Sequence, residues 1–499
     1  MPELQIKPII GFEVHVQLAT RSKLFCGCAV EFGSPPNSRV CPVCLALPGA
    51  LPVLNRAAYE LAVKAATALG CAIGPMTKWD RKSYFYPDLP KNYQISQYDL
   101  PVGGDGAFDI PRPDGTLKRV GIIRAHLEED AGKNQHEGLT YTRVDLNRCG
   151  TPLLEIVTQP DIADADEAYA FCVELQRLVR FLGISTADMQ KGQMRFEPNV
   201  NVAITTDDGR EFRTPISEVK NLNSFRSVRL AVQYEIERQV RQWQSDNDYT
   251  LKKLGKMNFG WDDVREVTEF QRGKEESHDY RYFPDPDLVP VMSDAAWLTS
   301  VRDEIGELPV ARQRRFEATY GITAKDAEII LADRATAVLF EDAIGCGADS
   351  TILAKQFMGI WNNAAAARGA NIGGLGMDAP RMAELANLVR DGVISATSAN
   401  AIVEKLCDAT APASQSPREI AESSGLIQIR DESATQAWID AAFAANPQAV
   451  ADAISGNEKK VKASSGFLRG QVMKLSGGKA DPKLTGELIE AALKKLTST

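Results

Sequence analysis

Hydrophobic and polar positions alternate in several stretches of residues 1–293, which is the pattern of half-buried strands. In the clearest of them, residues 9–18, the polar residues Glu13, His15 and Gln17 stand between hydrophobic residues. Because side chains alternate between the two faces of a strand, these polar side chains would share one face. For this stretch taken alone, a solvated outer face with an incidental histidine is the better interpretation.

Helical spacing interrupts this pattern at two places, residues 56–70 and residues 164–183. The second segment has Asp164 as a suitable N-cap and Gly183 as a suitable stop. We therefore predict that residues 1–293 form a β-rich domain of the α+β class, with a sheet that is backed by helices.

The pattern changes after residue 293 to alanine-rich segments with hydrophobic residues at helical spacing. We predict a helical domain over residues 294–409. The stretch TAPASQSP, residues 410–417, has the composition of a linker. It opens a last helical unit, residues 410–499.

Length, cysteine usage and charge narrow the class of protein. A chain of 499 residues exceeds the usual span of a single core. No segment resembles a membrane span or a secretion signal, and the cysteine count of nine is odd, so we expect a soluble cytoplasmic protein with reduced thiols. The net charge of −9 argues against a general polyanion binder. Residues 456–499 are nevertheless basic, and they are the expected place for contact with RNA phosphates.

Four of the nine cysteines fall within residues 24–44, as Cys26, Cys28, Cys41 and Cys44. Two close pairs separated by a loop that contains glycine and proline let four thiolates converge as a tetrahedron, which is the arrangement that Zn²⁺ prefers. Four protein ligands leave no position for water, so such a zinc would be structural. Unpaired core cysteines and a redox pair are the alternatives.

Three further strand-like segments place charged and polar residues opposite hydrophobic ones. These residues are Arg124, His126 and Glu128, followed by Glu129 and Asp130; Arg195, Glu197, Asn199 and Asn201; and Glu218 and Lys220. Carboxylates with an imidazole suit a divalent cation such as Mg²⁺, whereas basic residues beside them suit phosphoryl oxygens. The repeated pattern therefore favours a sheet face that supports phosphoryl transfer.

Two segments rich in tyrosine and proline complete the candidate chemistry. Residues 80–99 carry Lys82 and Lys91, and residues 277–290 carry Arg281. Either segment could be a loop that packs on the sheet, or it could stack on a nucleotide or a terminal base while its cation meets phosphate. The phosphate-binding loop, the protein-kinase and dinucleotide signatures, H-E-X-X-H and G-X-S-X-G are all missing from the sequence. If the protein uses ATP, it therefore does so on an unusual scaffold.

Seven segments, in this order along the chain, resemble the family of B subunits of the bacterial aspartyl/glutamyl-tRNA(Asn/Gln) amidotransferases. They are IGFEVHVQL, DRKSYFYPDLPKNYQISQYD, RAHLEEDAGK, VDLNRCGTPLLEIVTQPDI, EVKNLNSFRSV, HDYRYFPDPDLVP and GFLRGQVMK. The likeness runs from residue 9 to the C-terminus.

The resemblance implies a protein that binds misacylated Glu-tRNA(Gln) or Asp-tRNA(Asn) and uses ATP and Mg²⁺ to phosphorylate the side-chain carboxylate. Ammonia would then attack the acyl phosphate. In this family the partner A subunit, an amidase, releases the ammonia from glutamine, and a small C subunit holds the two larger proteins together. The resemblance also implies a β-rich cradle, then a helical domain, then a helical tail that meets the body of the tRNA.

The resemblance also carries roles to individual residues. It implies a Mg²⁺ site formed by Glu13, His15, Glu128 and Glu218. Lys82 and Lys91 match lysines near the nucleotide and the acyl acceptor, whereas Glu129, Lys220 and Arg281 lie in matching motifs and receive general site roles, Arg281 with the nucleotide. The basic tail residues expected to contact tRNA are Lys459, Lys460, Lys462, Arg469 and Lys474.

The sequence departs from the family at residues 196–198, where many members carry Cys-Asp-Ala in place of Phe196, Glu197 and Pro198. Glu197 is therefore left out of the expected metal ligands. Some members lack the four cysteines, which agrees with a structural zinc. The Gly-Gly-Ser-Ser pattern of amidases is missing, so we expect the isolated chain to be inactive with glutamine. The alternative function is a zinc-containing RNA-binding module without chemistry.

Overall fold

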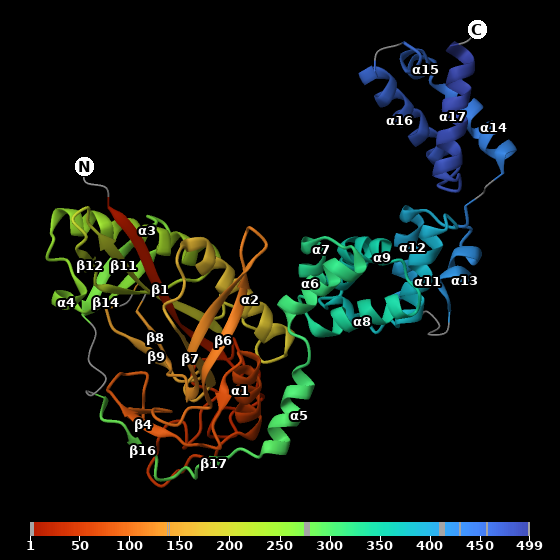
Figure 1. The fold of residues 1–499 in the computed structure, drawn as a ribbon. Helices are drawn as coiled ribbons and strands as arrows, with labels where there is room; N and C mark the ends of the chain where they lie inside the picture. Colours follow the sequence, from red (N-terminus) through yellow and green to blue (C-terminus); the bar gives the residue numbers. More distant parts are fainter. Residues whose placement is uncertain are drawn as a thin grey trace. The chain divides into compact units, whose positions relative to one another are not determined.

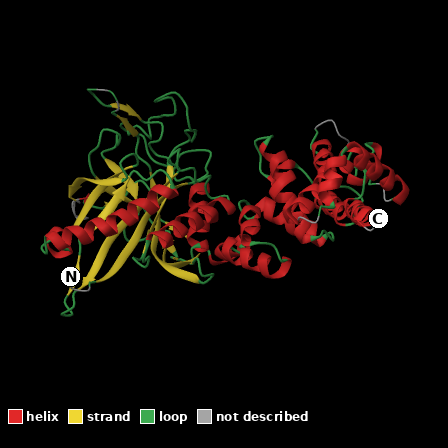
Figure 2. Ribbon diagram, turned by 90° about the horizontal axis from the view of Figure 1, so that it is seen from above, coloured by secondary structure: helices red, strands yellow, loops and turns green. Residues whose placement is uncertain are grey.

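The computed structural model describes residues 4–497 except 137, 139, 274–279, 409–414, 429–430 and 456–457. The chain forms two compact units, Met1–Arg312 and Gln313–Thr499. Among the described residues every named strand lies in the first unit, and the second unit is helical (Figures 1 and 2). This confirms the predicted α+β class, with a sheet-rich first part followed by helices. The division into domains at residues 293 and 409 stays a prediction.

A mixed sheet of ten strands forms the centre of the first unit. Its strands are β1 (Gln5–Gln17), β2 (Ala72–Ile73), β6 (Gly103–Pro111), β7 (Leu117–Glu129), β10 (Pro152–Thr158), β11 (Met194–Thr205), β12 (Glu211–Arg213), β13 (Ile216–Lys220), β14 (Lys256–Asp262) and β15 (Val267–Gly273). They lie in the order β15-β14-β13-β11-β1-β10-β7-β6-β2, and β12 pairs with β11. Neighbouring strands are antiparallel except β13 and β14, which are parallel.

Helices cover the hydrophobic face of this sheet. They are α1 (Arg56–Ala68), α2 (Ala165–Phe181) and α3 (Phe225–Ser245), with α5 (Ala295–Ile305) packed on α1 and the short α4 (Leu251–Leu254) before β14. Phe12 of β1 contacts Phe171 of α2 and Phe196 of β11, with ring centroids 5.2 and 6.3 Å apart. All three rings are almost fully buried. The hydrophobic residues of β1 therefore face the helices, and its polar residues face the other side.

The predicted signals of α2 are confirmed. Asp164 accepts a hydrogen bond from the backbone N–H of Glu167 at 2.7 Å, which satisfies one of the free donors at the helix start. The chain then leaves the helix through Gly183, whose φ of 68° lies in the left-handed region. This geometry fixes where α2 lies against the sheet.

Three small sheets complete the first unit. They contain β3 (Met76–Thr77) with β17 (Val291–Met292); β4 (Asp80–Ser83) with β5 (Tyr93–Ser96) and β16 (Phe283–Pro284); and β8 (Lys133–Gln135) with β9 (Arg143–Asp145). Arg81 of β4 donates to Asp285 at 2.8 Å and to Asp287 at 2.9 Å. The two tyrosine-rich segments therefore form one structure, although about 200 residues separate them.

The second unit is built from short helices. They are α6 (Pro309–Tyr320), which spans the boundary between the units, α7 (Ala324–Ile330), α8 (Arg334–Gly345), α9 (Ser350–Gln356), the π-helical turn η2 (Phe357–Trp361), α10 (Asn362–Ala366), the 3₁₀ turn η3 (Ile372–Leu375), α11 (Ala379–Arg390), α12 (Ala396–Leu406), α13 (Pro417–Ser423), α14 (Glu432–Ala445), α15 (Pro447–Ala453), α16 (Glu458–Leu475) and α17 (Pro482–Thr497). The last four share a core that includes Ile439, Leu468 and Ile489. No helix in the described part of the chain has the length and hydrophobicity needed to cross a membrane.

The five basic residues predicted to contact tRNA all belong to α16. Lys460, Lys462, Arg469 and Lys474 are exposed there, whereas the side chain of Lys459 lies outside the described part of the structure. Lys460 Nζ lies 3.5 Å from Asp452 Oδ1, an exposed ion pair of a kind that contributes little to stability. The helix therefore carries its charge on a solvent-facing surface.

Candidate active site

The registers of four antiparallel strands bring polar residues together on the face that the helices leave open. His15 of β1 lies opposite Glu155 of β10 on one side and Arg195 of β11 on the other. Glu155 in turn lies opposite His126 of β7. A second row contains Glu13, opposite Glu197 of β11. Residues that pair directly across strands have neighbouring side chains on one face, so the registers place a band of acids, imidazoles and cations across the centre of the sheet.

These side chains line a cavity of about 550 Å³, a size suited to a small ligand or a nucleotide. The lining residues are Glu13, His15, Lys82, Tyr84, Gln94, Tyr98, Arg124, His126, Glu128, Asp130, Ala131, Leu153, Glu155, Val157, Arg195, Glu197, Glu218, Lys220, Asn258, Arg272, Tyr280 and Tyr282. Six predicted site residues are among them, namely Glu13, His15, Lys82, Glu128, Glu218 and Lys220. The structure therefore brings most of the predicted set to one place.

The first acidic cluster contains His15, His126, Glu128 and Glu155. His15 Nε2 lies 3.5 Å from Glu155 Oε2, and His126 Nε2 lies 3.3 Å from the same oxygen and 3.5 Å from Glu128 Oε2. Glu128 also accepts a hydrogen bond from the Ser96 hydroxyl at 3.0 Å. The two carboxylates thus share both imidazoles, so the cluster concentrates negative charge at the centre of the cavity.

This negative charge changes the protonation of the cluster. Burial lowers the pKa of His15, but the hydrogen bond and charge of Glu155 and the charge of Glu197 outweigh it and raise the pKa to about 9. Burial raises the pKa of Glu155, yet the two histidines hold it well below its usual value. Protons on the two histidines therefore offset the negative charge of the carboxylates, as a bound divalent cation would.

The donor set of the first cluster fits a metal. Single donor atoms of His15, Glu128 and Glu155 lie within 4.8 Å of one another. Among the described residues, the buried Nδ1 atoms of His15 and His126 have no hydrogen-bond partner. Carboxylate oxygens with one imidazole are a suitable ligand set for a hard divalent cation that keeps several waters.

The second acidic cluster contains Glu13, Glu197 and Glu218, whose donor atoms also lie within 4.8 Å of one another. Two lysines offset most of its negative charge. Lys220 Nζ lies 2.9 Å from Glu197 and 3.0 Å from Glu218, and Lys256 Nζ lies 2.9 Å from Glu13 and 2.8 Å from Glu218. Burial lowers the pKa of Lys220, but the charges of Glu197 and Glu218 outweigh it and the pKa is raised. Both lysines therefore stay protonated beside the acids.

The tyrosine-rich segments supply a further part of the cavity lining. Lys82 of β4 lies over the rings of Tyr280 and Tyr84, with Nζ 4.8 and 5.7 Å from the ring centroids. Tyr98 and Tyr282 stack with centroids 4.5 Å apart. Aromatic faces beside a cation are suited to an adenine ring or a base and to its phosphates.

Three predicted residues lie elsewhere. Lys91 forms an ion pair with Glu129, and both side chains are almost fully buried. Glu129 also accepts from the backbone N–H of Ile95 at 3.0 Å. This pair lines a separate cavity of about 210 Å³ that the cysteine loop also borders. Arg281 is exposed, with its guanidinium 5.9 Å from the ring centroid of Phe85, and it does not line the main cavity.

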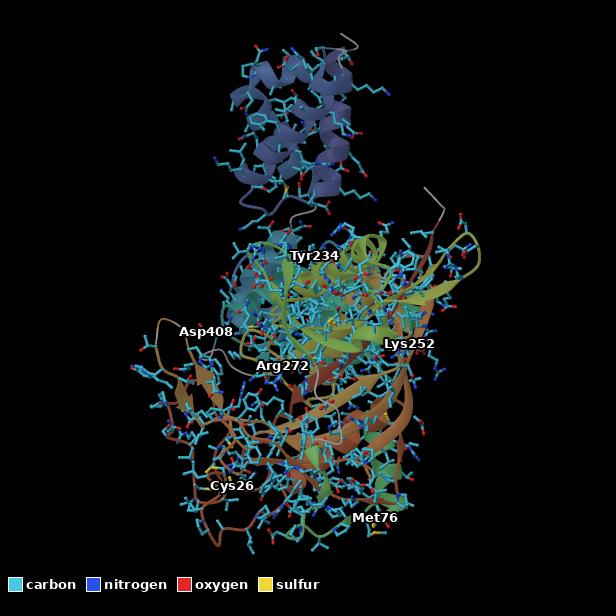
Figure 3. All side chains as sticks on the ribbon, turned by 90° about the vertical axis from the view of Figure 1, so that its left-hand side faces the viewer. Cys26, Met76, Tyr234, Lys252, Arg272 and Asp408 are labelled. Carbon is cyan, nitrogen blue, oxygen red and sulfur yellow. The ribbon has the colours of Figure 1, made fainter. Side chains whose placement is uncertain are left out.

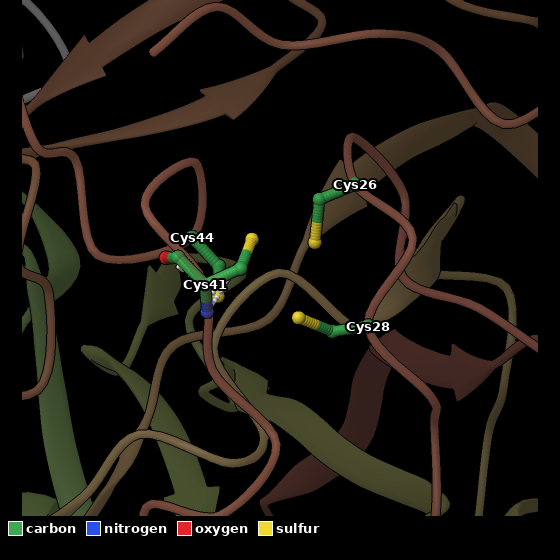
Figure 4. A group of neighbouring side chains, drawn as sticks. All are labelled: Cys26, Cys28, Cys41 and Cys44. Carbon is green, nitrogen blue, oxygen red and sulfur yellow. Dashed lines mark hydrogen bonds between the residues drawn. The ribbon is translucent and has the colours of Figure 1, made fainter.

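The four predicted cysteine ligands converge, as Figure 4 shows, from two loops whose sulfur atoms point toward one space. The four sulfur atoms lie within 4.8 Å of one another, and Cys41 Sγ and Cys44 Sγ are 3.8 Å apart. Zn–S bonds of about 2.3 Å in a tetrahedron require sulfur separations of about 3.8 Å. Hydrogen bonding from Cys26 and the charge of Lys23 help to lower the pKa of Cys44 to about 4. The donor set therefore fits Zn²⁺.

The cysteine loop lies outside the main cavity. Figure 3 labels Cys26 in this loop and Arg272 on β15, and the two lie in separate parts of the first unit. None of the four cysteines lines the main cavity. A zinc ion here would stabilise the loop that follows β1 and would take no part in chemistry at the clusters.

We expect Cys41→Ser to lower zinc content from about one per chain toward zero and to lower thermal stability. The loss would be several kcal/mol, a fraction of the roughly 10–16 kcal/mol that structural zinc contributes in small domains. Metal analysis of the purified chain and its thermal midpoint measure both effects. Cys346→Ser, at an exposed cysteine in the second unit, is the matched control. Unchanged zinc content in Cys41→Ser would refute the site.

Sequence reasoning missed several residues of the cavity. Glu155 lines it but was not predicted, and Lys256, which pairs with Glu13 and Glu218, was not predicted either. His126 was predicted on the polar face but not among the metal ligands. Glu155 is the one charged residue of the otherwise hydrophobic strand PLLEIVT, which marks it in the sequence but gives no alternation to show its face. Its place beside His15 and His126 depends on strand pairing between distant segments, which no local pattern encodes.

Comparison with known proteins adds the family. The family model of the GatB/GatE catalytic domain matches residues 8–299, and that of the GatB domain matches residues 338–493. The B subunit of the aspartyl/glutamyl-tRNA(Asn/Gln) amidotransferase of Rhodopirellula baltica is 44% identical over 496 residues, which cover 98% of this chain and 97% of that protein. The protein of the same name from Moorella thermoacetica is 42% identical over 98% of this chain and 100% of its own length.

The matches cover both compact units and include every strand that lines the main cavity. A catalytic-domain match over more than half of the chain and a relative this similar over nearly its full length agree with the motifs quoted above. The chain therefore belongs to the GatB/GatE family of tRNA-dependent amidotransferase B subunits.

Proposed function

We propose that this chain uses ATP to phosphorylate the side-chain carboxylate of Glu-tRNA(Gln), Asp-tRNA(Asn) or both, and that ammonia then converts the acyl phosphate to the amide. The observation that carries the proposal is the pair of acidic clusters with lysines on one sheet face. The products would be Gln-tRNA(Gln) and Asn-tRNA(Asn) for translation. The names of the relatives support the same assignment.

The reaction explains why the site needs both signs of charge. A carboxylate is a poor electrophile until one of its oxygens belongs to a phosphate leaving group, and ATP and the carboxylate repel each other. Transfer of the γ-phosphoryl group to the carboxylate oxygen releases ADP. Attack by ammonia on the carbonyl carbon then forms the C–N bond and releases inorganic phosphate and a proton. Lys82 offers a positive charge beside the acidic clusters throughout.

Mg²⁺ would be held by His15, Glu128 and Glu155, with Glu13, Glu197 and Glu218 as a second group of donors. When bound, it would neutralise phosphoryl oxygens. The chain's own residues position the site: β1, β7 and β10 fix the first group through their register, and Ser96 orients Glu128 through its hydrogen bond. The expected ligand Glu218 thus lies in the second group of donors, and Glu155, which was not expected, takes its place beside His15 and Glu128.

The ammonia would come from a partner. This chain lacks the amidase pattern in its sequence, so an amidase, the A subunit, would hydrolyse glutamine, and a small C subunit would hold the complex together. The decisive assay gives the purified complex Glu-tRNA(Gln), ATP and either glutamine or ammonium. We expect Gln-tRNA(Gln) from both donors with the complex, and no amide from glutamine with this chain alone. A complex that forms no amide from either donor would refute the proposal.

The tail would bind the tRNA body through α16. We expect simultaneous replacement of Lys459, Lys460 and Lys462 by alanine to weaken tRNA binding about 10- to 100-fold. The slope of log affinity against log salt concentration should also fall, by the equivalent of up to about three phosphate contacts. Binding is measured at several salt concentrations. The control is a triple variant at exposed lysines elsewhere, Lys191, Lys252 and Lys325. Equal affinities and salt slopes in the two triple variants would exclude α16 as a tRNA contact.

A further inference from the structure

The cations that line the main cavity differ in whether they have an acidic partner. Lys220 pairs with Glu197 and Glu218, and Arg195 pairs with Asp130 at 3.3 Å. Lys82 and Arg124 form no ion pair and donate no side-chain hydrogen bond to any described residue, although the cavity is rich in carboxylates. Among the described residues no carboxylate pairs directly with either cation, and Lys82 lies instead over the rings of Tyr280 and Tyr84.

Arg124 is the more unusual of the two. It stands on β7 opposite Val157 of β10, two residues before His126, and therefore shares a face with the first acidic cluster. Its Nε is buried, and among the described residues it has no hydrogen-bond acceptor. A buried guanidinium donor without an acceptor lowers stability unless something else satisfies it.

Both cations line the main cavity together with Tyr282. Burial raises the pKa of Tyr282 to about 12, and the positive charges of Lys82 and Arg124 oppose that rise. The three side chains belong to different strands or segments yet line the same cavity. A planar guanidinium fork and an ammonium group beside an aromatic ring are suited to an anion that has several oxygens.

We propose that Arg124 and Lys82 form an oxyanion subsite, in which the guanidinium of Arg124 binds a carboxylate or a phosphoryl group. The inference rests on the proposed function and adds to it the residue that holds one of the two reacting anions. Two sources share this chemistry: the side-chain carboxylate of the aminoacyl group and a phosphate of the nucleotide. In this arrangement the acidic clusters would hold Mg²⁺, and Arg124, on β7, would bind the anion.

The test measures equilibrium binding to the complete complex of wild type, Arg124→Ala and Arg124→Lys. The nucleotide probe is a non-hydrolysable ATP analogue with Mg²⁺. The acyl probes are Glu-tRNA(Gln) and its neutral counterpart Gln-tRNA(Gln), which differ only in the side-chain group. Arg119→Ala is the control, because Arg119 is exposed on the same strand and lies outside the cavity.

We expect Arg124→Ala to weaken one probe about 10- to 100-fold. Weaker nucleotide binding identifies a phosphate, whereas loss of the preference for Glu-tRNA(Gln) over Gln-tRNA(Gln) identifies the carboxylate. Arg124→Lys should lose part of the affinity, because it keeps the charge but not the fork. Arg119→Ala should bind all probes like the wild type. The thermal midpoint of Arg124→Ala should not fall, since no described partner is left unpaired.

Two results would overturn the subsite. In the first, Arg124→Ala binds every probe with an affinity within about twofold of the wild type. Such a change is too small for the loss of a charged hydrogen bond. The second is a lower thermal midpoint in Arg124→Ala with unchanged affinities in Arg124→Lys, which would give Arg124 a structural role. Failure of the proposed function is a different outcome: a wild-type complex that binds the probes but forms no amide with ammonium.

Discussion

Glu128→Gln is expected to lower the rate of ammonium-dependent amide formation by about a thousandfold. Glutamine has the shape of glutamate and can still accept the hydrogen bond from Ser96, but it removes the charge that His126 and His15 share. Losing that charge from a site that would hold a divalent cation costs about 4 kcal/mol of transition-state stabilisation, which corresponds to about three orders of magnitude in rate.

The assay uses saturating Glu-tRNA(Gln) and ATP, so that it reports the chemical steps. Glu211→Gln, on the exposed strand β12, is the matched control and should retain the wild-type rate. The thermal midpoint of Glu128→Gln should stay the same or fall slightly. Burial raises the pKa of Glu128, but the hydrogen bond and charge of His126 and the charge of Lys82 outweigh it and lower that pKa, so the fold favours the charged form. A Glu128→Gln complex that works at the wild-type rate would remove the first acidic cluster from the mechanism.

Lys91→Met is expected to lower the free energy of unfolding of the first unit by about 3–5 kcal/mol. The variant leaves the Glu129 carboxylate buried without its cation, and Glu129 is only 2% exposed. Burial by itself lowers the pKa of Lys91, but the charge of Glu129 outweighs it and raises that pKa, so the lysine is charged in the folded protein. Removing one member of a buried ion pair costs more than replacing both.

Lys91→Met combined with Glu129→Gln should therefore recover much of the lost stability. Urea unfolding of the full chain, followed by limited proteolysis, assigns the loss to the first unit by the fragments that survive. Lys64→Met is the matched control, because Lys64 pairs with the exposed Glu304 and such pairs contribute little. If Lys91→Met unfolds at the wild-type urea concentration, the pair is not a stabilising element of this unit.

The alternating pattern predicted much of the site because it determines on which face of the sheet each side chain lies. Glu13 and His15 share a face in the sequence and in the cavity, and Phe12 packs on α2 as the same pattern requires. The pattern also separates Glu128 from Glu129, since consecutive residues of a strand point to opposite faces. Glu128 enters the cavity, whereas Glu129 pairs with Lys91 behind it.

Other parts of the site depend on pairing between distant segments. Glu155 joins His15 because β10 pairs with β1 in one register, and Lys256 reaches Glu13 because β14 lies beside β13. Neither contact has a local signal. The cysteine cluster was easier to predict because both pairs lie within one short stretch, although its zinc is still a prediction.

The proposed reaction couples ATP cleavage to amide formation, and this coupling can be measured. The complex is given ammonium, ATP and either Glu-tRNA(Gln) or uncharged tRNA(Gln), and ADP and Gln-tRNA(Gln) are measured together. We expect about one ADP for each amide formed, and almost no ADP with uncharged tRNA. ADP release that is the same with uncharged and misacylated tRNA, or amide formed without ADP, would contradict it.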